Sequence, residues 1–239
     1  MKTNGNTVDE VWQTARDSRW LLFLLDRAGV GTPELYRTFA HRCAERALPV
    51  RGKDLLPSWQ QVLDAVQACA TGGITASELH RVGEELGGAA MAAGSIGLRV
   101  GDPGAALCLA IYHASNPSAI GASLFASRYG AEAFRLQALR NEPAAPGQVE
   151  ANRAYERERN GQARALRELA ERPFAGGVAT DRFDGLPLED YLRQGYLPDP
   201  HFQLDELALF APVTHRPWAF VRPTSHGLRR VATVPTDLS

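Results

Sequence analysis

Three side chains from distant stretches of this chain, His41, Asp102 and His113, have the types that acid–base chemistry needs. Histidine changes charge near neutral pH, and a carboxylate can orient it for proton transfer. Ser115, close to His113 in sequence, has the hydroxyl of a nucleophile, but nucleophile and base need a third, orienting group. The nearest carboxylate in sequence is Asp102. One hypothesis is therefore an enzyme of unfamiliar type built on this group, and the alternative is a helix end capped by hydroxyl groups.

Known catalytic and ligand-binding patterns are incomplete in the sequence. Gly121-Ala-Ser-Leu-Phe125 lacks the last glycine of the Gly-x-Ser-x-Gly elbow, which holds a nucleophilic serine at a sharp turn. Gly101-x-x-Gly104 is not followed by the Lys and Ser or Thr of a phosphate-binding loop. We therefore expect no nucleotide cofactor.

Candidate metal ligands come in pairs only. His41 and Glu45 share one helix face, but the sequence places no third and fourth ligand beside them. Glu78 and His80 are two positions apart and so lie on different faces. The cysteines are three in number, far apart and without a Cys-x-x-Cys pair: Cys43, Cys69 and Cys108. We expect no metal, with capping and surface roles for these residues.

The segment 207–236 contains no Asp or Glu but has four arginines with aromatic residues among them. Arginines interleaved with aromatic rings suit an anionic partner, either an acidic protein surface or a nucleic acid. The predicted partner-binding residues are Arg216, Trp218, Phe220, Arg222, Arg229 and Arg230. The alternative is that the arginines pair with acidic faces of the helical body.

Composition limits the classes of partner. The chain has 239 residues, 44% of them apolar, and a formal net charge of −1, so it has no overall field that attracts nucleic acid or an anionic membrane. The apolar run 20–25 is too short to span a bilayer, and residues 1–10 lack the layout of a signal peptide. We expect a cytoplasmic protein without a membrane partner.

Apolar spacing and turn signals predict helices along most of the chain. The capping box from Thr75 to Glu78 marks one start, and Thr32-Pro33 marks another. Stretches rich in Gly and Ala, such as 87–94, would let helix axes approach closely. The predicted helices span 8–28 (one or two helices), 34–48, 57–69, 75–94, 105–114, 118–139 and 149–172.

Residues 173–239 are rich in proline, which breaks a helix interior, so we expect no long helix there. A two-turn helix at 187–195 and short β-prone runs at 207–213, 218–222 and 228–234 are predicted there. The predicted fold class is all-α, a bundle or array of about seven helices with an irregular or weakly β C-terminal extension. We predict two parts, a helical domain over 1–175 and a Pro-rich extension over 176–239 packed on it.

The stretch 35–49, then 59–69 and 71–79, and the ending 162–174 resemble a loosely defined set of bacterial all-helical proteins. Some of these are assigned as immunity proteins of polymorphic toxin systems, and others, common in planctomycetes, have no assigned function. The resemblance implies a helical bundle that binds a partner, such as a toxin, and neutralises it. It carries no catalytic motif over to this sequence.

Three hypotheses for function follow. The favoured one is a non-enzymatic protein-binding module, immunity-like, whose contact surfaces are the arginine-rich tail and the charged helix 149–172. The second is a nucleic-acid-associated regulator, whose affinity would fall steeply with salt. The third is the enzyme of unfamiliar type.

Overall fold

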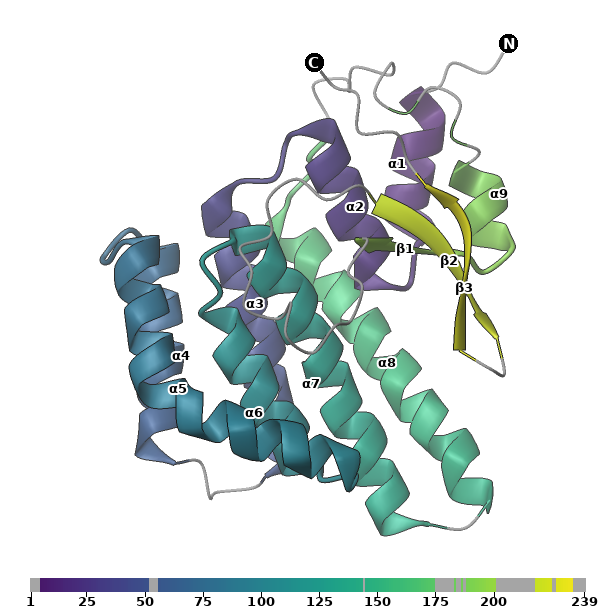
Figure 1. Cartoon of the computed structure of the whole chain (residues 1–239). Helices are drawn as coiled ribbons and strands as arrows, with labels where there is room; N and C mark the ends of the chain where they lie inside the picture. Colours follow the sequence, from purple (N-terminus) through teal and green to yellow (C-terminus); the bar gives the residue numbers. More distant parts are fainter. Residues whose placement is uncertain are drawn as a thin grey trace. The chain divides into compact units, whose positions relative to one another are not determined.

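The computed structural model describes residues 5–51, 56–143, 145–174, 183, 186, 188–200, 218–224 and 227–233. Within these residues the chain forms nine α-helices, one 3-10 helix and three short strands (Figure 1). The predicted all-α class with a weakly β C-terminal part is confirmed. Contacts divide the chain into two compact units, which we call the helical unit (Thr32–Ala170) and the mixed unit (Met1–Gly31 with Glu171–Ser239).

Most helix starts in the helical unit follow the capping signals read from the sequence. Thr32 and Ser118 accept amide hydrogen bonds from the first turns of their helices, and Thr75 with Glu78 forms the complete capping box. Proline begins three of the helices, where its missing amide hydrogen costs nothing. The elements are α3 (Pro33–Ala47), η1 (Leu48–Val50), α4 (Pro57–Ala70), α5 (Ala76–Arg99), α6 (Pro103–Ala114), α7 (Ala119–Asn141) and α8 (Ala145–Leu169).

Helix α7 is the centre of the helical unit, because it packs against α3, α6 and α8 (Figure 1). Helix α6 is buried along almost its whole length, which explains why it is apolar on every side instead of amphipathic. The core side chains of the unit come from α3, α4, α6 and α7, and include Phe39, Trp59, Leu63, Leu107 and Ile111.

Close approach of α5 and α6 requires glycine on α5. A Cβ atom at Gly83 would overlap the Oγ of Ser115 and lie 2.7 Å from its Cβ, and one at Gly87 would overlap the ring of Tyr112. A Cβ at Gly97 would lie 2.5 Å from the Cβ of Ala105. Glycine costs about 1 kcal/mol of helix propensity relative to alanine at each position. The predicted close packing of small-residue helices is thus observed at this contact, and it offsets that cost.

Substituting Gly83→Ala is expected to destabilise the helical unit by about 1–2 kcal/mol, because overpacking against Ser115 outweighs the gain in helix propensity. Urea unfolding monitored by circular dichroism measures the change. Gly104→Ala is the matched control, since its Cβ would meet only the Asp102 side chain, at 3.4 Å or more. A Gly83→Ala variant that is more stable than the wild type would contradict the close contact.

The corner between α6 and α7 depends on a buried arginine. Arg37 on α3 is 3% exposed, and its guanidinium donates to the carbonyl oxygens of Asn116 and Pro117 at 3.1 and 2.9 Å. Burial lowers the pKa of Arg37, but the two carbonyl acceptors lie at the negative end of α6. The Asn116 side chain also accepts from the amide of Ser118, so the turn leaves few polar groups unpaired.

The mixed unit combines both ends of the chain. It contains α1 (Gly5–Thr14), α2 (Ser18–Ala28), α9 (Leu188–Arg193) and an antiparallel sheet in the order β1 (Leu197–Pro200), β2 (Trp218–Thr224), β3 (Gly227–Thr233). Its core is a cluster of aromatic rings in edge and tilted contacts. These rings belong to Trp20, Phe23, Phe183, Tyr191, Trp218 and Phe220.

The predicted boundary after residue 175 is wrong for the N-terminal segment. Residues 1–31 belong with the C-terminal residues instead of with the helical unit. The physical reason is that the apolar face of α2 is covered by the tail: Phe23 stacks edge-on against Trp218 and Phe220. The tail is therefore half of a shared core and not an appendage.

Smaller differences from prediction concern element limits. Helix α8 begins at Ala145, with Pro146 in its first turn, four residues before the predicted start at 149. The 187–195 helix is observed as α9, and the strands predicted at 218–222 and 228–234 are β2 and β3. The run 207–213 lies outside the described residues. In the described part of the chain no helix is long and apolar enough to cross a membrane.

Candidate functional site

The three side chains of the enzyme hypothesis do not converge. Asp102 and His113 stand at opposite ends of α6, eleven residues and so about 16 Å apart along the helix axis. Asp102 caps α6 by accepting from the amide of Gly104 at 3.1 Å, and His41 on α3 pairs with Glu45 at 3.2 Å. Each residue has its own local structural role.

His113 is a core residue. It is 1% exposed and lies between the rings of Phe125 and Tyr129, with centroid distances of 4.8 and 5.2 Å. Burial and, to a smaller extent, the positive charge of Arg128 lower the pKa of His113 to about 3. The imidazole is therefore neutral at physiological pH.

The serines near His113 donate to backbone carbonyls. Ser115 donates to Tyr112 at 2.6 Å, Ser123 to Tyr36 at 2.7 Å and Ser127 to Leu124 at 3.0 Å. The Ser115 and Ser127 bonds are local, to carbonyls three residues earlier, and the Ser123 bond joins α7 to α3.

The candidate metal ligands do not gain further ligands in the described part of the structure. His41 and Glu45 share one face of α3, as their spacing predicted, and Glu78 is engaged in the capping box with Thr75. Among the residues that the structure describes, no three His, Cys, Asp or Glu side chains group around one point.

The tail aromatics predicted to contact a partner are buried. Trp218 is 6% exposed and donates its indole N–H to Asp26 at 2.8 Å, and Phe220 is 1% exposed between Trp20 and Phe23. These two rings form the core of the mixed unit, so the prediction that they contact a partner is wrong. Alternation along β2 turns both toward α2, because residues two apart share one face of a strand.

Of the four arginines predicted to contact a partner, the structure describes three, Arg222, Arg229 and Arg230. Arg216 lies outside the described residues. Arg222 pairs in register with Arg229, and Val221 with Arg230, across β2 and β3. The pairing of β2 with β3 thus brings these three arginines to neighbouring backbone positions in the sheet.

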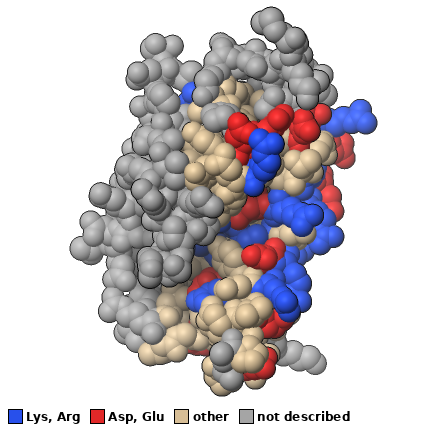
Figure 2. All heavy atoms as spheres, turned by 90° about the vertical axis from the view of Figure 1, so that its right-hand side faces the viewer, with Lys and Arg blue, Asp and Glu red and all other residues tan. Residues whose placement is uncertain are grey.

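The solvent side of α8 has exposed charges of both signs. We call this surface the α8 charged face; it consists of Glu150, Arg153, Glu156, Arg157, Arg164 and Glu168. Some of these pair with each other or with a neighbour: Arg157 bonds to Glu150, and Glu168 lies 3.8 Å from Arg42 of α3. Figure 2, viewed from the side of Figure 1 on which α8 lies, shows acidic and basic groups intermixed.

Beneath that face lies a buried polar network, which the sequence did not predict. Arg46 of α3 makes a bidentate pair with Glu158, 2.8 Å for each hydrogen bond, and Glu158 is only 6% exposed. Arg159, the next residue, donates to the hydroxyl of Ser127, and Gln162, about one turn further on, donates to the carbonyl of Ser127. These bonds fix the rotation of α8 against α3 and α7.

Sequence reasoning missed the network because it assigned only apolar residues to the buried side of α8. The apolar residues predicted on its buried side are Tyr155, Ala163, Leu166, Leu169 and Ala170. Of these, Tyr155 and Leu169 are partly exposed, while Glu158, Arg159 and Gln162 are buried. One available signal was Gly161, where a Cβ atom would overlap the Arg46 guanidinium.

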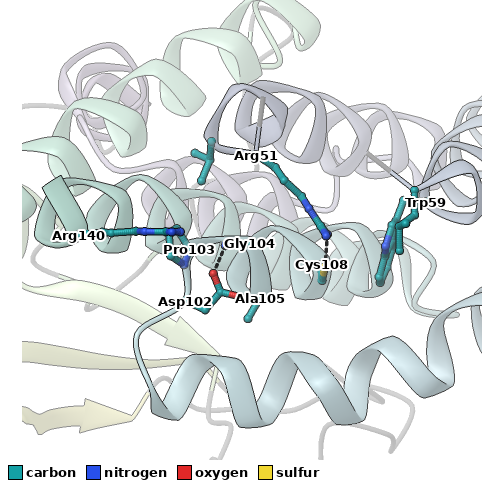
Figure 3. Close-up of a pocket in the computed structure, with 10 residues that line it drawn as sticks. Arg51, Trp59, Asp102, Pro103, Gly104, Ala105, Cys108 and Arg140 are labelled. Atoms are coloured by element: carbon teal, nitrogen blue, oxygen red, sulfur yellow. Dashed lines mark hydrogen bonds between the residues drawn. The ribbon is translucent and has the colours of Figure 1, made fainter. Parts of the chain in front are cut away.

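A cavity of about 440 Å³ lies in the helical unit where η1, α4, α6 and the end of α7 meet (Figure 3). Arg51 crosses one side of it and donates to the thiol of Cys108 at 3.7 Å. Arg140 comes from α7, Trp59 from α4, and Asp102 from the cap of α6. Burial raises the pKa of Cys108, and Asp102 adds to this, while Arg51 opposes it.

Comparison of the chain with protein-family models, with curated proteins and with solved structures finds no match.

Proposed function

We propose that this chain is a non-catalytic protein-binding module, with the α8 charged face as its main contact surface. The supporting observation is the buried polar network, because Arg46–Glu158 and the Ser127 contacts hold α8 in one orientation. A rigid helix loses little conformational freedom on binding, so its exposed charges are preorganised for a partner.

The charge pattern favours a protein partner. Basic and acidic residues are intermixed along the α8 charged face, and such a pattern selects a surface with the complementary arrangement of charges. Phosphate chains attract basic residues only, so the acidic residues of this face would oppose a nucleic acid. The burial of Trp218 and Phe220 also removes the rings that base stacking would need.

An immunity or accessory role in a bacterial toxin or defence system is the form of binding that the resemblance favours. The partner would be a toxin or effector protein whose surface carries charges complementary to the α8 charged face. In this proposal the tail arginines Arg222, Arg229 and Arg230 provide a second, basic contact region.

The test is co-expression of the chain with the product of the gene directly upstream, followed by growth measurement and binding in vitro. We expect growth protection and a saturable complex, and we expect Arg153→Glu with Arg157→Glu to weaken binding by about tenfold or more, mostly through slower association. Arg229→Glu with Arg230→Glu tests the second contact region and should leave the thermal midpoint nearly unchanged.

The control is Arg81→Glu, which reverses an exposed, ion-paired arginine of α5, outside the α8 charged face. It should leave both growth protection and affinity at wild-type levels. A harmless upstream product that does not bind argues against the immunity role. A complex that tolerates the Arg153 and Arg157 reversals argues against α8 as the contact surface.

A further inference from the structure

We propose that the cavity between η1, α4, α6 and the end of α7 binds a small organic monocarboxylate. Its volume of about 440 Å³ is in the range of small-molecule sites. This inference rests on side chains of the helical unit alone and is independent of the α8 charged face.

Two arginines give the cavity its preference for an anion. Arg51 and Arg140 both line it, and neither has a carboxylate partner among the described residues. The bond that Arg51 makes there is to the Cys108 thiol, a weak acceptor. Other arginines of the unit, such as Arg46 and Arg135, are in bidentate pairs with glutamates. A guanidinium without such a partner is available to hold a carboxylate in the same way.

Trp59 provides an independent indication of a ligand. Its side chain lines the cavity and is 1% exposed, yet its indole N–H has no acceptor in the described structure. A buried donor without an acceptor is costly, and such groups are rare in folded proteins. Trp59 and Cys108 line the same region of the cavity (Figure 3), so a ligand oxygen reaching between Arg51 and the indole would supply the missing acceptor.

The other residues that line the cavity indicate the net charge of the ligand and its apolar part. Asp102 adds a negative charge, although its carboxylate is engaged as the cap of α6, so two arginines and one aspartate leave a formal charge of +1. One negative charge on the ligand balances this, whereas a dianion would be repelled by Asp102. Apolar side chains make up much of the rest of the lining: Val50, Leu56, Pro103 and Ala105. They favour a ligand in which the carboxylate is attached to an apolar group.

The experiment follows the indole N–H signals of the ¹⁵N-labelled full chain during titration with benzoate. Trp59→Phe identifies the Trp59 signal among those of the four tryptophans. We expect a saturable shift of this signal with benzoate, a weaker effect with inorganic phosphate, and none with benzamide, the neutral isostere of benzoic acid. Each titration is run at constant ionic strength adjusted with sodium chloride.

Variants assign the anion contact to the two arginines. Arg51→Gln with Arg140→Gln is expected to weaken benzoate binding by about tenfold or more, since each loses a charge-assisted contact. Arg81→Gln, an exposed arginine elsewhere in the unit, should bind benzoate as the wild type does. Thermal melting verifies that the double variant is folded. The proposal is overturned if the Trp59 signal does not saturate, if benzamide shifts it equally, or if the double variant binds with unchanged affinity.

Discussion

Acidification from pH 7 to pH 4.5 is expected to cost this protein about 2–3 kcal/mol of folding free energy through His113 alone. The imidazole is buried between Phe125 and Tyr129, and burial lowers its pKa to about 3. In the unfolded chain a histidine has a pKa of about 6.5. Below that pH the unfolded state binds a proton that the folded state excludes, so stability falls as the pH falls from about 6.5 toward 3.

Urea unfolding of the wild type and of His113→Phe at both pH values measures this contribution. Phenylalanine keeps the ring between Phe125 and Tyr129 but has no proton to bind, so the variant should lose about 2–3 kcal/mol less than the wild type on acidification. His80→Gln, on the exposed side of α5, is the matched control and should keep the wild-type pH dependence. If His113→Phe is as acid-sensitive as the wild type, the imidazole is not buried as described.

The second large effect is expected from Glu158→Gln, at about 2 kcal/mol of lost stability, the size expected when hydrogen bonds to a charged group are lost. The substitution keeps the shape of the side chain but removes the charge that pairs with Arg46. It also removes a negative charge from a region that holds the buried Arg159. Water can reach the Arg46 guanidinium, whose side chain is 41% exposed, so the cost comes from the lost charged hydrogen bonds and from the buried Arg159, which loses a nearby negative charge.

Glu168→Gln on the same helix is the control. Glu168 is 72% exposed and lies 3.8 Å from Arg42, so its loss should change stability by less than about 0.5 kcal/mol. Adding Arg46→Met to Glu158→Gln should recover part of the loss, because it removes the cation left behind. Equal effects of the Glu158 and Glu168 substitutions in chemical denaturation would show that Glu158 is not buried in an ion pair.

Local signals in the sequence predicted much of the helical unit correctly. Thr32-Pro33, the Thr75–Glu78 box and the apolar spacing of α4 depend on neighbours within one or two turns, so they can be read without a fold. The small-residue stretch 87–94 also predicted a close helix contact; Gly87 is at that contact, and so is Gly83, which the prediction did not include.

Features that depend on distant parts of the chain could not be predicted in this way. Arg46 and Glu158 are 112 residues apart, and nothing in either segment indicates that the pair is buried. The cavity likewise takes Arg51, Trp59 and Arg140 from three separate elements. The aromatics of the tail were assigned to the surface because arginines surround them, whereas strand alternation decides which side chains are buried.

The division of the mixed unit between the two ends of the chain has a consequence for biosynthesis. When Trp20 and Phe23 leave the ribosome, the rings that cover them are almost 200 residues from being translated. The helical unit can fold meanwhile, since its contacts lie within 32–170. The apolar side of α2 around Phe23 therefore stays exposed, or bound by a chaperone, until translation is nearly complete. A recombinant product that stops near residue 175 would expose this apolar surface permanently, which favours aggregation.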